Sequence, residues 1–465
     1  MLWLNLNQPE CFDIDENQQF IFEQGSRVGL AAHHLFPNAE LIPEDLPFMD
    51  KLSKTKTMVS QYKSIFEGSF KWDQCFCIVD ALIYEDDGWH LIEVKSSTGI
   101  KSNHTHDIGF QFYILRQLGI PVVRCSICHI NTNYVRSGEL DYTQLFTMVD
   151  LTDDVLDEIP MIEKNIHEFL PIFKTDQIDM PIGPHCNSPY ECSAIDYCWK
   201  NVPNHSVFDI GELSINDKFS FYYQDKVSIN DFTPDDFSKF KQRQQIACEI
   251  EGIDFINREK LSKFLTSMSK PISYLDFEAF QTALPPFNHA SPYEQIPFQV
   301  SLHVDDGSSI QYHGYICSDG DPRESILNEL KRILPKTGSI IVFNKQYESM
   351  ILKKLKKQYP VDTAFIDDIL TRLIDLEDPF KNNYIYLRKM NGKTSIKYIL
   401  PALFPTLSYR YLKVSSGRSI NAMVKKLHEP ETSAQAHKYL EEYGKLDTYA
   451  MVLIVNKLKE LTFDS

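Results

Sequence analysis

The sequence contains no long apolar segment and no recognisable export signal. No apolar run reaches the roughly 18 residues that a membrane-spanning helix needs. The opening segment MLWLNLNQPECFD has no basic residue and does not resemble a signal peptide. We therefore expect a cytoplasmic protein without a membrane partner. In that reducing environment, the ten cysteines would serve in the core or as metal ligands rather than in disulfides.

Positive charge is also scarce, and it is unevenly distributed. The net charge is −17 at pH 7; residues 1–204 contain 14 Lys and Arg against 30 Asp and Glu, whereas residues 205–465 contain 33 against 34. Non-specific affinity for phosphates should be weak, so any contact with nucleic acid must come from local patches. ILKKLKKQYP (351–360) and YLRKMNGKTSIKY (386–398) are candidates. For the first of them we favour an ordinary solvated helix face.

Length and composition predict a globular chain of two or three domains. The chain of 465 residues is too long for one core, and 43% hydrophobic with 12% aromatic content excludes a disordered protein. Residues 204–270 are more polar, with Asp-rich turns and one helical segment, and they show no catalytic constellation. We interpret this region as a mainly helical connector.

The segment FCIVDALIYEDDGWHLIEVKSS (76–97) contains the first chemical motif. CFCIVDALIYE and WHLIEVK read as two strands joined by the turn EDDG. Glu93 and Lys95 share one face of the second strand, and the first strand can place Asp80 beside Glu93. Converging carboxylates repel unless a cation or a proton joins them, and a nearby ammonium can orient a water. This predicts a hydrolytic metal site for phosphodiesters; an ordinary hairpin with an edge ion pair is the alternative.

The next segment, DIGFQFYILRQLGIPVVRCSICHI (107–130), reads as a helix with Gln111, a turn and a strand. Asp80, Glu93-Val94-Lys95 and a helical Gln111 together resemble the PD-(D/E)XK nuclease core of the RecB type, found also in iron–sulfur nucleases of CRISPR adaptation. The resemblance implies that Asp80 and Glu93 hold Mg²⁺ or Mn²⁺, that Lys95 assists the attacking water, and that Gln111 positions the site.

Two features of this resemblance stay open. The family usually has Gln-x-x-x-Tyr, but Leu115 occupies the fourth position after Gln111, so either Tyr113 compensates or Gln111 only packs. The resemblance also implies a further ligand upstream. Glu67 in SIFEGSF is one candidate, and His33 or His34 in GLAAHHLF is the other.

Three cysteines occur in the short polar segment GPHCNSPYECSAIDYCWK (183–200). Cys186, Cys192 and Cys198 are spaced more widely than typical zinc pairs, and iron–sulfur clusters accept more varied spacing. In the iron–sulfur nucleases that this region resembles, three cysteines follow the core and a fourth precedes it. That implies a [4Fe-4S] cluster with Cys11 as the fourth ligand. The alternative is a degenerate cluster without metal.

The segment CSICH (125–129) matches the C-x-x-C-H pattern of covalent haem attachment. It lies within an expected strand, and that haem chemistry belongs to exported proteins. We therefore interpret Cys128, like Cys75 and Cys77, as a core residue.

A second set of carboxylates occurs in the last third of the chain. Asp276 and Glu278 share one face of the strand ISYLDFEAF, Glu348 lies in the first turn of a helix, and Tyr443 and Asp447 lie four apart on a strong helix. This order resembles the DEDD exonucleases of the RNase H-like fold, in the subtype with a tyrosine. The resemblance implies that the four acids hold two Mg²⁺ ions and that Tyr443 orients the attacking water. The superfamily has Asp where this chain has Glu348.

Three further residues are candidates for substrate binding. Asp375 ends a predicted strand, where relatives often have an aspartate near the substrate. Lys393 precedes the helix start TSIKY and Lys397 lies within it, and the N–H groups of this helix start can meet a phosphate.

The chain as a whole, from FEQGSRVGLAAHHLFP to YGKLDTYAMV, resembles an uncharacterised bacterial family, domain of unknown function 2779. The resemblance implies a mixed α/β fold. A restriction-endonuclease-like PD-(D/E)XK domain would occupy residues 1–203 and end in the cysteine cluster. An RNase H-like mixed-sheet domain would occupy residues 271–465, and residues 204–270 would connect the two domains.

From these motifs we expect a Mg²⁺- or Mn²⁺-dependent nuclease, with an exonuclease favoured. The expected substrate is DNA, single-stranded or with a free end, in repair, recombination or defence. The alternatives are a nucleic-acid-binding or scaffold protein in which one or both sites are inactive, and an RNA exonuclease.

Overall fold

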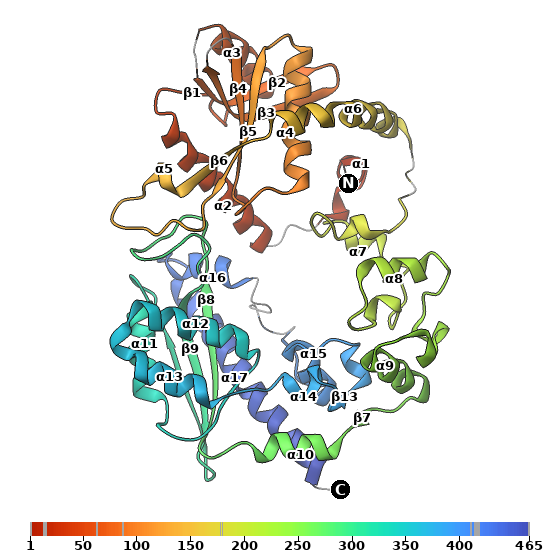
Figure 1. The fold of residues 1–465 in the computed structure, drawn as a ribbon, viewed down its shortest axis with the longest axis vertical. Helices are drawn as coiled ribbons and strands as arrows, with labels where there is room; N and C mark the ends of the chain where they lie inside the picture. Colours follow the sequence, from red (N-terminus) through yellow and green to blue (C-terminus); the bar gives the residue numbers. More distant parts are fainter. Residues whose placement is uncertain are drawn as a thin grey trace. The chain divides into compact units, whose positions relative to one another are not determined.

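The computed structural model describes residues 2–12, 16–61, 64–85, 88–176, 178, 180–409, 412 and 419–463. Helices and three β-sheets make up these residues (Figure 1), which confirms the mixed α/β class. The chain forms two compact units. Unit 1 contains Met1–Met180 and Gln281–Glu294, and unit 2 contains Pro181–Phe280 and Gln295–Ser465. Within the described residues, every helix is too short or too polar to cross a membrane.

Unit 1 is built on a sheet whose six strands are adjacent in sequence order. The strands are β1 (Glu40–Leu41), β2 (Ser64–Trp72), β3 (Cys75–Glu85), β4 (Gly88–Lys95), β5 (Val122–Ile130) and β6 (Phe146–Asp150). The pairs β2–β3, β3–β4 and β5–β6 are antiparallel, whereas β1–β2 and β4–β5 are parallel. The predicted hairpin is confirmed as β3 and β4; Asp86 and Asp87 of its turn lie outside the described residues.

Helices cover both faces of this sheet (Figure 1). Because β4 and β5 are parallel, a crossover must join them, and α4 (Ser102–Gln117) provides it. With α3 (Phe48–Gln61) and α6 (Thr152–Phe169), α4 packs on the face that contains Leu91. The opposite face, with Ile92, packs against α2 (Glu16–Ala32). The short helices of this unit are α1 (Leu2–Asn7) and α5 (Tyr142–Leu145).

Residues 281–294 complete the second core of unit 1, although they follow a strand of unit 2 in the sequence. Ala283 is fully buried in the same cluster as Ile92. The Arg136 guanidinium donates to the carbonyl groups of Pro285 and Pro286, at 3.1 and 2.8 Å. This excursion of the chain was not anticipated from the sequence.

The main sheet of unit 2 has the order β10-β9-β8-β11-β12. Its strands are β8 (Ile272–Phe280), β9 (Ile296–Asp305), β10 (Ile310–Ile316), β11 (Ile340–Val342) and β12 (Leu373–Asp375). The pairs β8–β9 and β9–β10 are antiparallel, and β11 runs parallel to both of its neighbours. This arrangement places β8 at the centre.

Alternate residues of β8 face different helix layers. Leu275 and Phe277 pack in one core with α11 (Arg323–Ile333), α12 (Lys345–Gln358) and α13 (Thr363–Arg372). Ile272 and Tyr274 pack on the other side with the long helix α17 (Ser433–Phe463) and with α10 (Arg258–Thr266). The shorter helices α14 (Asp378–Lys381), α15 (Ile396–Leu403) and α16 (Ile420–Leu427) follow in the chain between α13 and α17.

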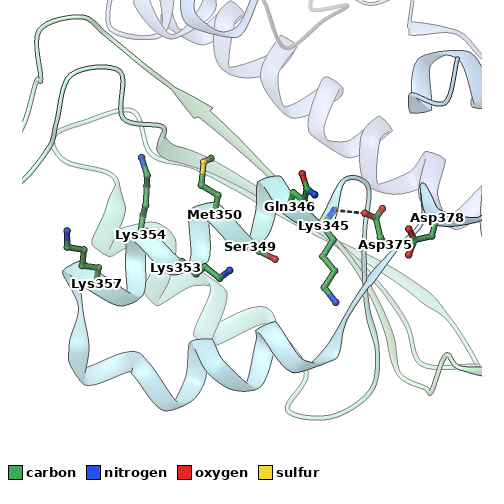
Figure 2. Close-up of a pocket in the computed structure, with 9 residues that line it drawn as sticks. All are labelled: Lys345, Gln346, Ser349, Met350, Lys353, Lys354, Lys357, Asp375 and Asp378. Carbon is green, nitrogen blue, oxygen red and sulfur yellow. Dashed lines mark hydrogen bonds between the residues drawn. The ribbon is translucent and has the colours of Figure 1, made fainter. Parts of the chain in front are cut away.

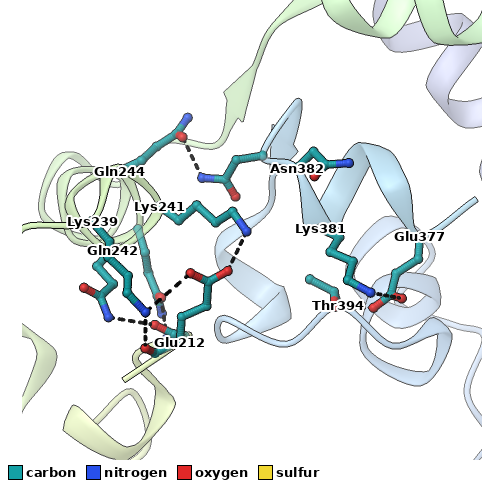
Figure 3. A network of polar contacts seen from close by, with 12 residues as sticks. Glu212, Lys239, Lys241, Gln242, Gln244, Glu377, Lys381, Asn382 and Thr394 are labelled. Carbon is teal, nitrogen blue, oxygen red and sulfur yellow. Dashed lines mark hydrogen bonds and ion pairs between the residues drawn. The ribbon is translucent and has the colours of Figure 1, made fainter. Parts of the chain in front are cut away.

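The predicted connector, residues 204–270, packs within unit 2. It contains α8 (Ile215–Tyr222), α9 (Phe240–Glu251) and β7 (Phe255–Ile256), and β7 pairs with β13 (Ile385–Tyr386). The buried Glu249 carboxylate accepts hydrogen bonds from Tyr386 and Arg388, at 3.0 and 3.2 Å. Figure 3 shows the neighbouring polar contacts, in which Lys241 reaches Glu212. The connector is therefore anchored by side chains that come from far along the sequence.

Candidate functional site

Three carboxylates converge in unit 2. Asp276 and Glu278 come from β8, and Asp447 comes from α17, which packs across that strand. One oxygen from each carboxylate lies within 4.8 Å of the other two. In the part of the chain that the structure describes, no other set of three Asp, Glu, His or Cys side chains meets this criterion.

The local sequence explains why both β8 acids point to α17. Tyr274 and Ile272 face the core that contains α17, and the two-residue period of a strand carries the same face on to Asp276 and Glu278. The predicted shared face is therefore confirmed.

Gly444 lets α17 approach the sheet closely. A Cβ at this position would collide with Gln299 Nε2 and Ser301 Oγ of β9. Two side-chain contacts fix the helix there: Gln299 Nε2 donates to the Leu440 carbonyl at 2.8 Å, and His303 Nδ1 lies 2.8 Å from Thr448 Oγ1. Asp447 lies between these contact points along the helix and is thereby held over β8.

Burial and mutual repulsion favour protonation of these acids when no cation is present. Burial raises the pKa of Asp276 and of Glu278, and the charges of neighbouring carboxylates raise both further. Burial also raises the pKa of Asp447 to about 6, against the opposing effects of Tyr409, Lys397 and Tyr443.

The donor set suits a divalent cation. Asp276 Oδ2 and Asp447 Oδ1 are buried and have no hydrogen-bond partner among the described residues. Buried polar atoms are normally satisfied, and hard cations such as Mg²⁺ and Mn²⁺ prefer carboxylate oxygens. The residues present therefore fit such an ion.

Glu348 lies next to this group on the first turn of α12. Glu348 is only 1% exposed, and its Oε2 has no hydrogen-bond partner within the part of the chain that the structure describes. Burial raises the pKa of Glu348 to about 9, and the charges of Asp276 and Asp375 contribute. The longer side chain therefore still brings its carboxyl group to the cluster.

Lys397 and two tyrosines border the carboxylates. Lys397 Nζ lies 5.4 Å from the ring centre of Tyr443 and 5.6 Å from that of Tyr409. The two rings meet edge to face with centroids 6.0 Å apart. Burial and the charge of Asp447 raise the pKa of the Tyr443 hydroxyl, which therefore stays protonated at neutral pH. Sequence reasoning missed Tyr409, because it belongs to no motif and approaches Asp447 only through the fold.

The other two predicted substrate residues of unit 2 make different contacts. Asp375 accepts hydrogen bonds from the backbone N–H groups of Lys345 and Asn344, at 3.0 and 3.2 Å, and so tethers the start of α12. Lys393 is exposed, and its ammonium lies 3.3 Å from the Tyr398 hydroxyl.

In unit 1, Glu93 is held by two of its predicted neighbours. Lys95 Nζ lies 2.8 Å from Glu93 Oε1, and Gln111 Nε2 donates to Glu93 Oε2 at 2.6 Å. Lys95 also reaches Asp107 at 2.8 Å. Burial would lower the pKa of Lys95, but the charges of Glu93 and Asp107 outweigh it and raise the value. The structure thus brings Glu93, Lys95 and Gln111 together.

Asp80 lies on β3 beside this group, and its Oδ2 accepts a hydrogen bond of 2.6 Å from the Val94 N–H. Burial raises the pKa of Asp80 well above its usual range, and the charge of Glu93 adds to the effect. The Glu67 backbone has a φ of 58°, a region that side-chain-bearing residues seldom adopt and that is enriched at functional sites.

Of the two candidate histidines, His33 is the one that lies near Glu67. His33 Nε2 lies 3.9 Å from Glu67 Oε1, and both residues line a cavity of about 10 Å³ with Asp80. His34 instead stacks on Tyr142, with ring centroids 4.1 Å apart.

Tyr113 does not face this site. It packs edge-on against Trp72 in the hydrophobic core, with centroids 5.6 Å apart. Because Gln111 and Tyr113 are two residues apart on α4, they point in different directions. The suggestion that Tyr113 replaces the missing family tyrosine is therefore wrong.

Two of the three cysteines of residues 183–200 belong to a small apolar cluster in unit 2. Cys186 is buried and Cys198 packs nearby, together with Phe219. The Gly183 N–H points to Cys186 Sγ at 3.5 Å, and the Cys192 N–H donates to the Cys186 carbonyl at 2.8 Å. Cys11 is half-buried in unit 1.

The C-x-x-C-H segment lies in strand β5, as predicted. Cys125 and Cys128 are fully buried on opposite faces of the sheet. Burial raises the pKa of each thiol to about 12, which makes both poor nucleophiles. Cys75 and Cys77 are core residues as well.

Comparisons with known proteins identify relatives without a known role. Residues 273–395 match the family model described as "Domain of unknown function (DUF2779)". This segment contains Asp276, Glu278 and Glu348 but not Asp447. The chain is 26% identical over 217 residues to the "Uncharacterized protein MG366 homolog" of Mycoplasma pneumoniae, which covers 40% of this chain and 32% of that protein.

Two further relatives are similar in extent. The "Uncharacterized protein MG366" of Mycoplasma genitalium is 25% identical over 43% of this chain and 34% of its own length, and the "Uncharacterized protein UU173" of Ureaplasma parvum is 26% identical over 40% and 31%. The match thus spans about a third of the length of these curated relatives. No solved structure matches the chain.

Proposed function

We propose that this chain is a metal-dependent nuclease whose principal active site is formed by Asp276, Glu278 and Asp447. The convergence of these three carboxylates within 4.8 Å carries the proposal. Their order in the sequence, and their resemblance to the DEDD exonucleases, support an RNase H-like domain. Bound Mg²⁺ or Mn²⁺ would supply Lewis-acid stabilisation and an activated water for phosphodiester hydrolysis.

The neighbouring residues have separate roles in this proposal. Tyr443 keeps its proton, so it orients the attacking water by hydrogen bonding and does not act as the base. The ammonium of Lys397, beside Asp447 and Glu278, neutralises charge on the scissile phosphate. Glu348 is the fourth carboxylate and takes the place of the usual aspartate.

Unit 1 contributes a second proposed nuclease centre of the PD-(D/E)XK type. Asp80 and Glu93 would hold Mg²⁺ or Mn²⁺, with Glu67 or His33 as the further ligand and Lys95 beside the attacking water. The contacts of Glu93 with Lys95 and Gln111 support this assignment. The same contacts occupy both oxygens of Glu93, so we assign the main activity to unit 2.

We also propose a [4Fe-4S] cluster for which Cys186, Cys192 and Cys198 supply three of the ligands. The support is the resemblance to iron–sulfur nucleases and the proximity of Cys186 and Cys198 to one apolar cluster. An anaerobic preparation should be brown and contain iron and sulfide. Replacing all three downstream cysteines with Ser should abolish the colour.

A strand-resolved nuclease assay tests the function. Labelled single-stranded DNA, duplex DNA with free ends, and RNA are incubated with Mn²⁺ and the wild type, Asp276→Asn, Asp80→Asn or the double variant. We expect DNA degradation that Asp276→Asn abolishes and Asp80→Asn largely retains. The proposal is wrong if the wild type degrades none of these substrates, and degradation of RNA alone would identify an RNA exonuclease.

A nucleic-acid-binding or scaffold role is the second candidate. The replacement of the family aspartate by Glu348 and the engaged oxygens of Glu93 favour it. In that case the wild type would bind oligonucleotides in Mn²⁺ without cleaving them, and Asp276→Asn would change nothing.

A further inference from the structure

A row of lysines runs along the exposed side of α12. Residues 345, 349, 353 and 357 are four apart, so Lys345, Ser349, Lys353 and Lys357 form one stripe of the helix. Gln346, Met350 and Lys354 form the stripe beside it. Together with Asp375 and Asp378, these side chains line a hollow of about 700 Å³ (Figure 2). The buried side of α12 carries Glu348, Ile351, Leu352 and Leu355.

Three of the four lysines in this row are available to an anion, whereas the Lys345 ammonium already donates to the Leu373 carbonyl at 2.7 Å. Among the described residues, Lys353, Lys354 and Lys357 have no ion-pair partner, whereas Lys356 on the same helix pairs with Asp367 at 2.6 Å. The Asp375 carboxylate is already engaged by backbone N–H groups at the start of α12 (Figure 2). In a chain of net charge −17, such a local surplus attracts an anion.

The spacing of the lysines favours an extended anion over a compact one. Residues 345–357 rise by about 18 Å along the helix axis, in steps of about 6 Å for every four residues. A single phosphate can meet only one or two of these ammonium groups, whereas a chain of phosphates can meet Lys353, Lys354 and Lys357 together. Met350 adds a flexible apolar surface between the lysines, against which a sugar or base can pack.

The row also leads to the carboxylates. It begins at Lys345, the first residue of α12, and Glu348 lies on that same first turn. An anionic strand bound along the lysines would therefore reach the helix end that contributes to the proposed active site.

We propose that this lysine row binds the phosphodiester backbone of single-stranded DNA and guides its end to Asp276, Glu278 and Asp447. This inference rests on the proposed nuclease function and adds the surface by which the substrate is held. A positively charged track of this kind gives sequence-independent, salt-sensitive binding.

The test measures binding separately from cleavage. The Asp276→Asn protein, in EDTA, is titrated into fluorescein-labelled oligo(dT) and, in parallel, oligo(rU), between about 50 and 300 mM KCl. A triple variant, Lys353→Gln with Lys354→Gln and Lys357→Gln, is compared with Lys356→Gln, which removes one lysine from the same helix outside the hollow. A triple Lys→Arg variant at the same three positions keeps the charge.

We expect the triple Gln variant to lose about tenfold in oligo(dT) affinity at low salt. The slope of log affinity against log salt should fall by about 2, since each lost phosphate contact on a single strand contributes about 0.7. The Lys356→Gln and triple Arg variants should stay within about twofold of the parent.

Three outcomes would overturn the inference. If the parent binds oligo(dT) and the triple Gln variant binds equally well, the lysine row is not the binding surface, although the proposed nuclease function stands. If the parent binds oligo(rU) only, the assignment to DNA is wrong. If the parent binds neither, the inference is wrong, and the proposed function is decided separately by the nuclease assay with Mn²⁺.

Discussion

Asp276 on β8 and Asp447 on α17 present carboxylate oxygens within 4.8 Å of each other, although β8 and α17 are far apart in the sequence. Each has a buried oxygen for which the described residues provide no hydrogen-bond partner. Two such carboxylates repel when both are ionised. A proton or a cation must therefore join them, and this requirement leads to the first two predictions.

Divalent metal should stabilise the protein more at pH 8 than at pH 5. The folded-state pKa of Glu348 is raised to about 9 and that of Asp447 to about 6, so the folded state holds protons that the unfolded chain releases above about pH 4. The stability that these two acids contribute without metal is therefore fully present below about pH 4, and it falls as the pH rises through 6 and 9. Mn²⁺ binds the carboxylates after they have lost those protons, so it should stabilise the folded state more at the higher pH.

Differential scanning fluorimetry with and without Mn²⁺ at the two pH values measures this effect. At a concentration about a hundredfold above its dissociation constant, a ligand adds about 2.7 kcal/mol to the free energy of unfolding. The melting temperature of the transition that involves this site should therefore rise by several degrees at pH 8. The Asp276→Asn variant is the control and should respond little. An equal rise at both pH values in the wild type would contradict the prediction.

Asp276→Asn should also stabilise the metal-free protein at pH 8. The amide removes one charge from a buried cluster whose members raise each other's pKa. We expect a gain of about 1–2 kcal/mol at pH 8 and almost none at pH 4, where the acids are protonated. Chemical denaturation in EDTA at both pH values tests this, and destabilisation at pH 8 would mean that the carboxylate has a structural partner instead.

Gly444→Ala should separate α17 from the sheet and impair the site. The added methyl group would collide with Gln299 and Ser301, and overpacking of this kind costs about 1–3 kcal/mol. Gly25 in α2 is a matched control, because a Cβ there meets nothing within 4 Å. Gly25→Ala should raise stability by roughly 0.5–1 kcal/mol through helix propensity. The measurements are thermal stability and Mn²⁺ affinity; equal effects of both changes would refute the close approach.

Gln111→Ala should destabilise unit 1 and leave cleavage by the unit 2 site unchanged. Loss of the amide leaves the buried Glu93 Oε2 without its hydrogen bond, which costs about 1–3 kcal/mol. Gln117→Ala, at the exposed end of the same helix, should change stability by less than about 0.5 kcal/mol. Urea unfolding and the Mn²⁺-dependent nuclease assay provide the two readouts. A complete loss of cleavage in Gln111→Ala would move the main activity to unit 1.

Several elements could be predicted from the sequence because they depend on neighbours along the chain. The two-residue period placed Glu93 with Lys95 and Asp276 with Glu278, and the helical period placed Tyr443 and Asp447 on one face of α17. The turn at EDDG and the segment around Gln111 predicted a hairpin followed by a helix. Each of these conclusions needs only backbone geometry within about ten residues.

Other features could not be predicted in this way. Residues 281–294 return to the core of unit 1, where Ala283 is buried, although their composition resembles that of an ordinary loop. The same applies to the choice of His33 over His34 beside Glu67, and to the position of Tyr113 in the core. Each depends on which distant surface a segment packs against, and the local sequence pattern of the segment does not specify that surface.

The sequence by itself determined the mixed α/β class, the acidic residues available for chemistry and the local faces on which they lie. Only the tertiary structure decided that Asp447 meets Asp276 and Glu278, that Tyr409 and Lys397 border them, and that both oxygens of Glu93 are occupied by protein partners. The physical reason is that a periodic pattern fixes the direction of a side chain relative to its own strand or helix. Its distance to another element is set by packing, as at Gly444, where the absence of a single Cβ lets α17 approach β9.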